Sequence, residues 1–169
     1  MTSDLLNRLD GDLGVRRTLA RLGDSIFRRD RDAHGECYCE DGEWHAFGTI
    51  TRGRDAIVDH WWNVMQGFPF VRQSISSLVI EVEGDTAVSR GHVDEVLGMP
   101  DGSHQIVMGV YHSTFLKHDA EWLLKVHRYD QVYFGSPLLD GKFFPILDYG
   151  RPPHDPDPER LTAMMDISL

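Results

Sequence analysis

Cysteine is scarce in this sequence, and its spacing argues against a fold held by disulfides. Only two residues are cysteine, Cys37 and Cys39, with one residue between them. That separation is too short for an easy disulfide, and two thiols alone do not make a four-ligand zinc site. We expect two reduced thiols in a half-buried segment. The sequence also has no histidine pair at one-turn helical spacing, so we expect no metal site.

Long apolar runs are also absent. No stretch approaches the roughly 18 apolar residues that a membrane-spanning helix needs. Residues 1–10 contain no hydrophobic core of the kind that secretory signals carry. We therefore expect a cytoplasmic protein.

Positive charge is in short supply. The chain has 17 Lys plus Arg against 27 Asp plus Glu, so its net charge is −10 with histidine neutral. Nucleic acids and anionic membranes are bound chiefly through Lys and Arg, so we expect neither as a partner. The 41% of hydrophobic residues in a 169-residue chain is enough for one sizeable core, since a chain of this length buries roughly 70% of its unfolded surface.

The hydrophobic spacing predicts helices followed by strands. Residues from about 12 to 30 repeat apolar side chains at helical spacing, and Asp30 falls close to the middle of that apolar stripe. Residues 43–50 resemble a short hairpin, and residues 54–65 a second helix. Four long strand-like runs follow, at residues 71–82, 86–97, 104–117 and 122–134. Because short turn sequences separate these runs, neighbouring strands should pair antiparallel.

This order predicts an α+β fold in which helices close the concave side of a curved antiparallel sheet. We assign residues 1–135 to that domain. The remaining segment, residues 136–169, holds six of the eight prolines. We expect it to form an extended strap that ends in a short helix from Asp157 through Met165.

The order of several short motifs resembles the SnoaL-like branch of the NTF2-like superfamily, over roughly residues 14–135. The motifs are Asp30-Arg31-Asp32, Tyr38-Cys39-Glu40-Asp41-Gly42-Glu43-Trp44, Glu83-Gly84-Asp85-Thr86-Ala87 and Glu121-Trp122. The resemblance implies a cone with a lidded apolar pocket, a homodimer or homotrimer, and no metal or organic cofactor. Many relatives are proton-transfer lyases or isomerases, and others are transport factors or binders, so the fold alone does not settle function.

The sequence departs from the dehydrochlorinase-like members of this branch. In those relatives a histidine early in the first long strand acts as general base, and an aspartate on the first helix orients it. Gln73 and Phe27 stand at these two positions here. A neutral amide does not accept a proton near pH 7, so that pair cannot operate. A helix shifted by one turn would bring Asp30 near the site instead.

Sheet alternation directs other titratable side chains toward the concave face. Burial there would raise the pKa of a carboxyl group and lower the pKa of an imidazole, which moves both toward neutrality. We predict two sets of site residues from this face and from the first helices. The predicted catalytic set is His127, Glu95, Tyr111, Tyr129 and Asp30. The predicted substrate-binding set is Phe27, Trp44, Trp61, Gln73, Val93, Val107 and Gln131.

Structural roles explain several of these residues equally well. His127 on a strand can be a satisfied core residue, and the two tyrosines can be pocket wall. A one-residue bulge would turn Glu95 to solvent. On the opposite face, His92, Asp94 and His112 favour a solvated or subunit-facing surface over a metal cluster.

Two functional hypotheses remain open on the sequence. The first is a cofactor-independent lyase that acts by dehydration, elimination or retro-aldol loss of formaldehyde on a small, apolar, aromatic metabolite. The second is a non-catalytic module that holds a small hydrophobic ligand or docks a protein partner. A histidine or carboxyl group that titrates between about pH 6 and 8 in the site favours the first hypothesis.

Overall fold

Helices precede the long strands in the chain, as the sequence predicts. The computed structural model describes residues 2–144. Its elements in chain order are α1 (Thr2–Arg28), α2 (Arg31–Gly35), β1 (Tyr38–Ala46), β2 (Thr49–Arg52), α3 (Arg54–Met65), β3 (Phe70–Glu83), β4 (Thr86–Gly98), β5 (His104–His118), β6 (Glu121–Gly135) and β7 (Lys142–Phe143). The four long strands and α3 match their predicted bounds to within one residue. The predicted helix from Asp157 lies outside the described residues.

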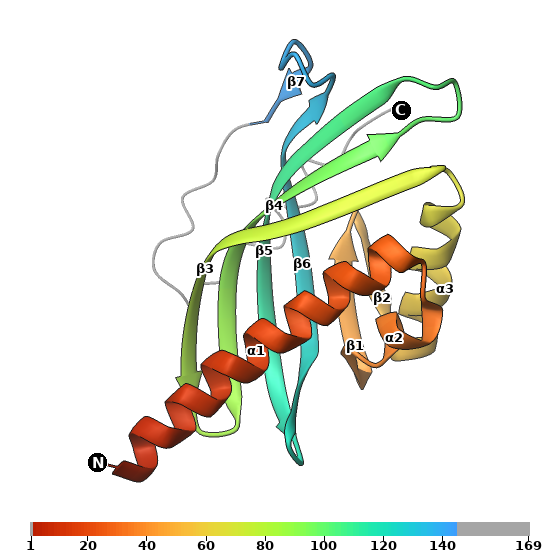
Figure 1. Ribbon diagram of the computed structural model, residues 1–169. Helices are drawn as coiled ribbons and strands as arrows, with labels where there is room; N and C mark the ends of the chain where they lie inside the picture. The colour runs from red at the N-terminus through yellow and green to blue at the C-terminus, as the bar shows by residue number, and fades with distance from the viewer. Residues whose placement is uncertain (1, 145–169) are drawn as a thin grey trace.

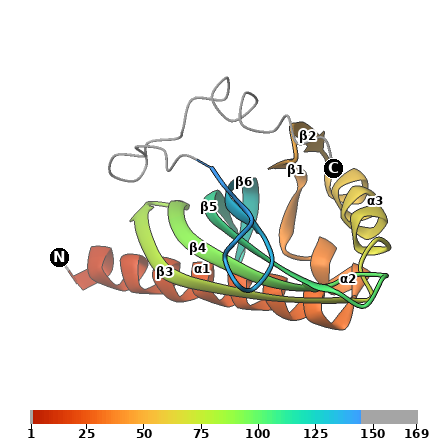
Figure 2. The same cartoon turned by 90° about the horizontal axis from the view of Figure 1, so that it is seen from above.

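The strands form one curved, unclosed sheet in the order β2-β1-β6-β5-β4-β3, with β7 paired to β6. All pairs are antiparallel except β1 with β6. The helix α1 packs chiefly on the edge strand β3 and also contacts β6, and Figures 1 and 2 show it running along the curved sheet. This arrangement confirms the predicted α+β fold. The strand β7 was not predicted and lies in the segment assigned to the strap.

Alternating burial along β4 identifies the inward face of the sheet. Ala87, Gly91 and Val93 are buried, whereas His92 and Asp94 between or beside them are exposed. The pairing of β5 with β6 shifts register twice, after Met108 and after Thr114. Between these shifts, Tyr111 pairs with Tyr129 and Ser113 pairs with His127. Tyr111, Tyr129 and His127 therefore share the inward face of the sheet with Val93, as strand alternation predicts.

The first helix begins about ten residues earlier than predicted. Its N-terminal leucines lie on the outer face, where they do not contribute to the inward apolar stripe; they are Leu5, Leu6, Leu9 and Leu13. The helix ends at Arg28 because Arg29 adopts a left-handed conformation with φ of 55°. Its length does not make it a membrane span: within residues 2–144, no helix is both long and apolar enough to cross a bilayer.

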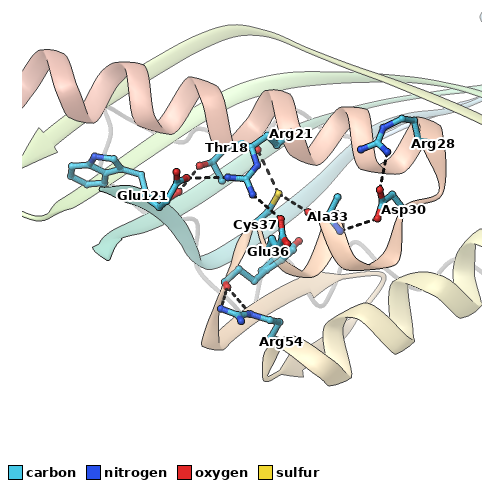
Figure 3. Close-up of polar contacts among 11 residues, drawn as sticks. Thr18, Arg21, Arg28, Asp30, Ala33, Glu36, Cys37, Arg54 and Glu121 are labelled. Carbon is cyan, nitrogen blue, oxygen red and sulfur yellow. Dashed lines mark hydrogen bonds and ion pairs between the residues drawn. The ribbon is translucent and has the colours of Figure 1, made fainter. Parts of the chain in front are cut away.

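Polar contacts fasten α1 to its neighbours (Figure 3). The buried Thr18 hydroxyl donates to the carbonyl of Trp122 on β6. Arg21 donates to Glu121 at 3.0 Å and to Glu36 at 3.1 Å, which joins α1 to β6 and to the end of α2. Surface ion pairs contribute up to about 1 kcal/mol each, so the buried contact matters more than the exposed ones.

Both cysteines are free, and both are buried more fully than predicted. Burial raises the pKa of the Cys37 thiol to about 11. Since the thiolate is the reactive form, this side chain behaves as a small apolar core residue.

Close packing of α1 against β6 depends on Gly14. A Cβ atom at this position would lie 2.1 Å from Cδ1 of Trp122, which is 1% exposed. We expect Gly14→Ala to lower the free energy of unfolding by about 1 to 2 kcal/mol, because overpacking outweighs the gain in helix propensity.

Gly23 provides the matched control for this prediction. It lies on the same helix, and nothing lies within 4 Å of a Cβ placed there. Gly23→Ala should raise the free energy of unfolding by up to about 1 kcal/mol through helix propensity alone. Urea unfolding followed by circular dichroism measures both variants. Equal midpoints for the two would contradict the packing of Gly14 on Trp122.

Candidate active site

A glutamine side chain joins a carboxyl group and a phenol on the inward face of the sheet. Gln73 on β3 pairs directly with Glu95 on β4. Its Nε2 atom donates to Oε1 of Glu95 at 2.8 Å and to the hydroxyl oxygen of Tyr111 at 2.8 Å. One neutral amide therefore spans three adjacent strands and holds two potential proton-transfer groups beside each other.

Burial changes the proton affinity of both groups. It raises the pKa of Glu95 above its ordinary value, although the hydrogen bond from Gln73 opposes the shift. The pKa of Tyr111 rises well above its ordinary value because the phenol is desolvated. Tyr111 thus stays protonated, and since its oxygen accepts from Gln73, its O–H is left to donate. A carboxylate that binds protons more tightly beside a phenolic donor suits general acid–base chemistry.

His127 lies next to this group on β6 and is 2% exposed. Its Nδ1 atom is 2.7 Å from the hydroxyl of Ser113, and its ring centroid is 4.2 Å from that of Tyr111. Burial lowers the pKa of His127 to about 3, so the imidazole is neutral at pH 7. A neutral imidazole offers one donor and one acceptor, and the Ser113 contact uses one of them.

Aromatic rings extend the group toward β1. The Tyr129 ring lies 5.8 Å from the Tyr111 ring and 5.8 Å from the Phe47 ring. Within the described part of the chain, the buried Tyr129 hydroxyl has no hydrogen-bond partner. Gly109 makes room for this ring, since a Cβ there would lie 2.3 Å from Cε2 of Tyr129. An unpaired buried hydroxyl among aromatic rings is a ready partner for a ligand oxygen.

The sequence reasoning missed a second buried imidazole, His34 on α2. The His34 ring stacks on Trp61 with centroids 3.9 Å apart, and its Nδ1 lies 3.2 Å from the hydroxyl of Ser25. Burial lowers the pKa of His34 to about 3. A usable signal was present: Asp30 is a good N-cap, and a short helix beginning after it places His34 near its inner side.

Asp30 does not belong to the site, which corrects the prediction. Its carboxylate caps α2 by accepting from the backbone N–H of Ala33 at 3.0 Å and binds Arg28 at 2.8 Å (Figure 3). These two donors lower its pKa. The predicted helical position fails because the turn at Arg29 takes Asp30 off the helix.

Phe27 is also wrongly predicted as a residue of the inward pocket. It is 56% exposed on the side of α1 that faces the edge strand β3, where its ring meets the edge of Phe70 at 6.2 Å. The other predicted substrate-binding residues lie inward. Trp44, Trp61, Val93 and Val107 belong to the buried cluster that contains Tyr111 and Tyr129, and Gln131 is half-buried opposite Gly109.

A cavity of about 520 Å³ lies between α1 and the edge strand β3. The rings of Tyr111, Tyr129 and His127 pack against one another on the inward face of the sheet. On the flank, small side chains such as Ala20 and Gly23 on α1 leave space, and the register of β3 with β4 shifts between Ser76 and Val79. Gln73 lines this cavity and also binds Glu95 and Tyr111.

The outer face of the sheet carries no metal cluster within the described residues. His92 and Asp94 are exposed there, as predicted, whereas His112 is 5% exposed and lies 3.8 Å from Asp130. Burial and two nearby arginines lower the pKa of His112 to about 4. The solvated alternative is therefore wrong for His112, and the subunit-facing alternative stays a prediction.

The low pKa values of His34 and His127 give a direct test. Both imidazoles should stay neutral from pH 8 down to pH 5, because the pKa of each is lowered from 6.5 to about 3. The unfolded chain binds these protons below about pH 6.5, so they also reduce stability as the pH falls toward 4. Ring ¹⁵N NMR, assigned with His34→Gln and His127→Gln, measures the charge. An imidazolium signal for either residue at pH 5 would contradict the burial.

Solved structures with the same fold include several enzymes. The model matches hexachlorocyclohexane dehydrochlorinase LinA-type3 from Novosphingobium barchaimii LL02 with TM-score 0.72 at 19% identity, over 84% of this chain and 99% of that one. It matches a candidate scytalone dehydratase from Novosphingobium aromaticivorans DSM 12444 with TM-score 0.71 at 19% identity, over 80% of this chain and 91% of that one. A variant of a protein of unknown function from Mycobacterium tuberculosis is 26% identical, with TM-score 0.66 over 70% of this chain and 74% of that one.

Sequence comparison assigns the family. No curated protein sequence matches the chain. The family model of the SnoaL-like domain matches residues 7–128, which include most of α1, all elements from α2 to β5, and the first half of β6. The chain is therefore a member of the SnoaL-like domain family.

Proposed function

We propose that this protein is a cofactor-independent lyase that acts on a small apolar aromatic substrate. The reaction is a dehydration, an elimination or a retro-aldol loss of formaldehyde. The observation that carries the proposal is the Gln73 amide bound to both Glu95 and Tyr111. It holds a carboxyl group of raised pKa beside a phenol that remains protonated. The pair supplies a base and a hydrogen-bond donor at adjacent positions.

In the dehydration variant, the Glu95 carboxylate takes a proton from a substrate carbon. The electrons of that C–H bond form the new double bond, and the neighbouring C–O bond breaks. The Tyr111 O–H donates a hydrogen bond to the departing oxygen, and the proton held by Glu95 ends on that oxygen as water. Substrate therefore becomes alkene plus water, with no electron acceptor required.

The remaining groups of the cluster position the substrate. Trp44 and Tyr129 supply aromatic surface, which favours a planar apolar substrate. His127 stays neutral and acts as a hydrogen-bond partner, because its pKa of about 3 makes it a weak base at pH 7. This supports Glu95 as the base in our proposal. His127 then acts as a hydrogen-bond partner of the substrate, and not in the catalytic role predicted from the sequence.

A non-catalytic binding role is the second candidate. The observation that favours it is the neutral amide of Gln73 at the position where the resemblance to dehydrochlorinases expects a histidine base. In that case the same aromatic cluster would hold a hydrophobic ligand, and Gln73 would recognise one of its polar groups. The two candidates differ in whether product forms.

Glu95→Gln tests the catalytic role. We first screen aryl diols, hydroxysteroids and halogenated rings for elimination products with the wild-type protein. On any converted substrate, Glu95→Gln should lower kcat/KM by about 10² to 10⁴, since it removes the base and keeps the oxygen that accepts from Gln73. Asp94→Asn is the matched control, because Asp94 is the neighbouring carboxylate on the exposed face of β4.

Two outcomes would contradict the proposal. Full activity of Glu95→Gln on a converted substrate would remove Glu95 from the reaction. Binding of several screened compounds with no product from any of them would favour the non-catalytic candidate. On any converted substrate, Asp94→Asn should retain the wild-type rate.

A further inference from the structure

We propose that the cleft between α1 and β3 binds a small aromatic anion, with its acidic group on Arg72 and its ring against Phe27. The cleft has a volume of about 520 Å³, which lies within the roughly 300 to 1,000 Å³ of sites for small molecules. It lies on the flank of the sheet, apart from the centre of the aromatic cluster. The inference does not depend on the proposed lyase activity.

The charges around the cleft favour an anion. Two arginines, Arg16 and Arg72, and one acid, Asp24, line it. Asp24 is already bound by Arg28 at 2.8 Å, and Arg16 is bound by Asp12 at 2.6 Å. The exposed side chain of Arg72 has no ion pair or side-chain hydrogen bond within residues 2–144, although its backbone pairs with β4. Its guanidinium is therefore available for a carboxylate or sulfonate, which it can bind through two N–H groups.

The apolar walls favour a ring. Phe27 is 56% exposed and Phe70 is 43% exposed, and their rings meet edge to face at 6.2 Å. Leu19, Ile75 and Leu78 line the cleft between the helix and the strand. An aromatic ligand beside Phe27 would remove apolar surface from water on both partners, at roughly 25 cal/mol per Å² of area.

The backbone itself leaves the space open. Nothing lies within 4 Å of a Cβ placed at Gly23, in contrast to Gly14, which lies nearer the N-terminus of the same helix. On the facing strand, Ser77 adopts φ of 50° where the register with β4 shifts. A small residue on the helix thus faces an irregular stretch of the edge strand. The space in the cleft therefore depends on the backbone of α1 and β3, and not on the position of one movable side chain.

Gln73 connects the cleft to the interior. It lines the cleft, and its amide nitrogen binds Glu95 and Tyr111. The buried Oε1 atom of Gln73 has no hydrogen-bond partner among the described residues. A ligand in the cleft therefore lies against the side chain that orders these two groups, and its binding should alter the NMR signal of the Gln73 side-chain amide.

Two fluorescent probes distinguish the contribution of the ligand's charge to binding from that of its aromatic ring. One is 8-anilinonaphthalene-1-sulfonate, and the other is its uncharged analogue N-phenyl-1-naphthylamine. Arg72→Gln should weaken binding of the sulfonate by about 10-fold or more, as expected for loss of a charge-assisted hydrogen bond. It should leave binding of the uncharged probe within about twofold. Arg17→Gln is the matched control, since Arg17 is exposed on α1 and does not line the cleft.

Gly23→Leu tests the location with both probes. The added side chain enters open space, so the protein should remain folded by circular dichroism while both probes bind more weakly. Chemical-shift changes caused by the sulfonate should include Phe27, Arg72 and the side chain of Gln73. Unchanged sulfonate binding in Arg72→Gln would overturn the inference even if Gly23→Leu does not fold. Unchanged binding of both probes in a folded Gly23→Leu would overturn it as well.

Discussion

The hydrogen bonds of the Gln73 amide are the constraint on which the candidate site depends. A buried carboxyl group is costly unless a donor faces it, and Gln73 supplies that donor across the β3–β4 pair. The same nitrogen binds the oxygen of Tyr111 and so leaves the phenolic proton available. At this position the resemblance leads one to expect a histidine, and this chain instead has an amide that binds a carboxyl group on the next strand.

Burial changes the pKa values of the titratable groups in different directions. The carboxyl of Glu95 binds its proton more tightly than an exposed glutamate does, whereas the imidazoles of His34 and His127 bind theirs far more weakly. Each imidazole has a serine hydroxyl at Nδ1 and an aromatic ring against its face. The histidines are therefore neutral members of an aromatic core, and the one inward carboxylate of β4 is the group with basic character.

Most of the fold could be predicted from the sequence because its strands are long, β-branched and separated by short turns. Alternation along β4 also placed Glu95 correctly, since no bulge interrupts its pairing with Gln73. Two features escaped prediction for physical reasons. The left-handed turn at Arg29 removed Asp30 from the helix, and a cavity lies on the flank between α1 and β3, where the register of β3 with β4 shifts. Both features depend on tertiary packing, which the hydrophobic periodicity of the sequence does not predict.

The titration of Glu95 tests the Gln73 bridge most directly. Side-chain ¹³C NMR of the wild-type protein and of Gln73→Leu gives the carboxyl pKa in each, with Glu95→Gln for assignment. The bridge predicts a wild-type midpoint above the ordinary value of 4.5 and a higher one in Gln73→Leu, because the amide donor partly offsets the effect of burial. A wild-type midpoint at or below 4.5, unchanged by the loss of Gln73, would contradict a buried carboxyl group held by this amide.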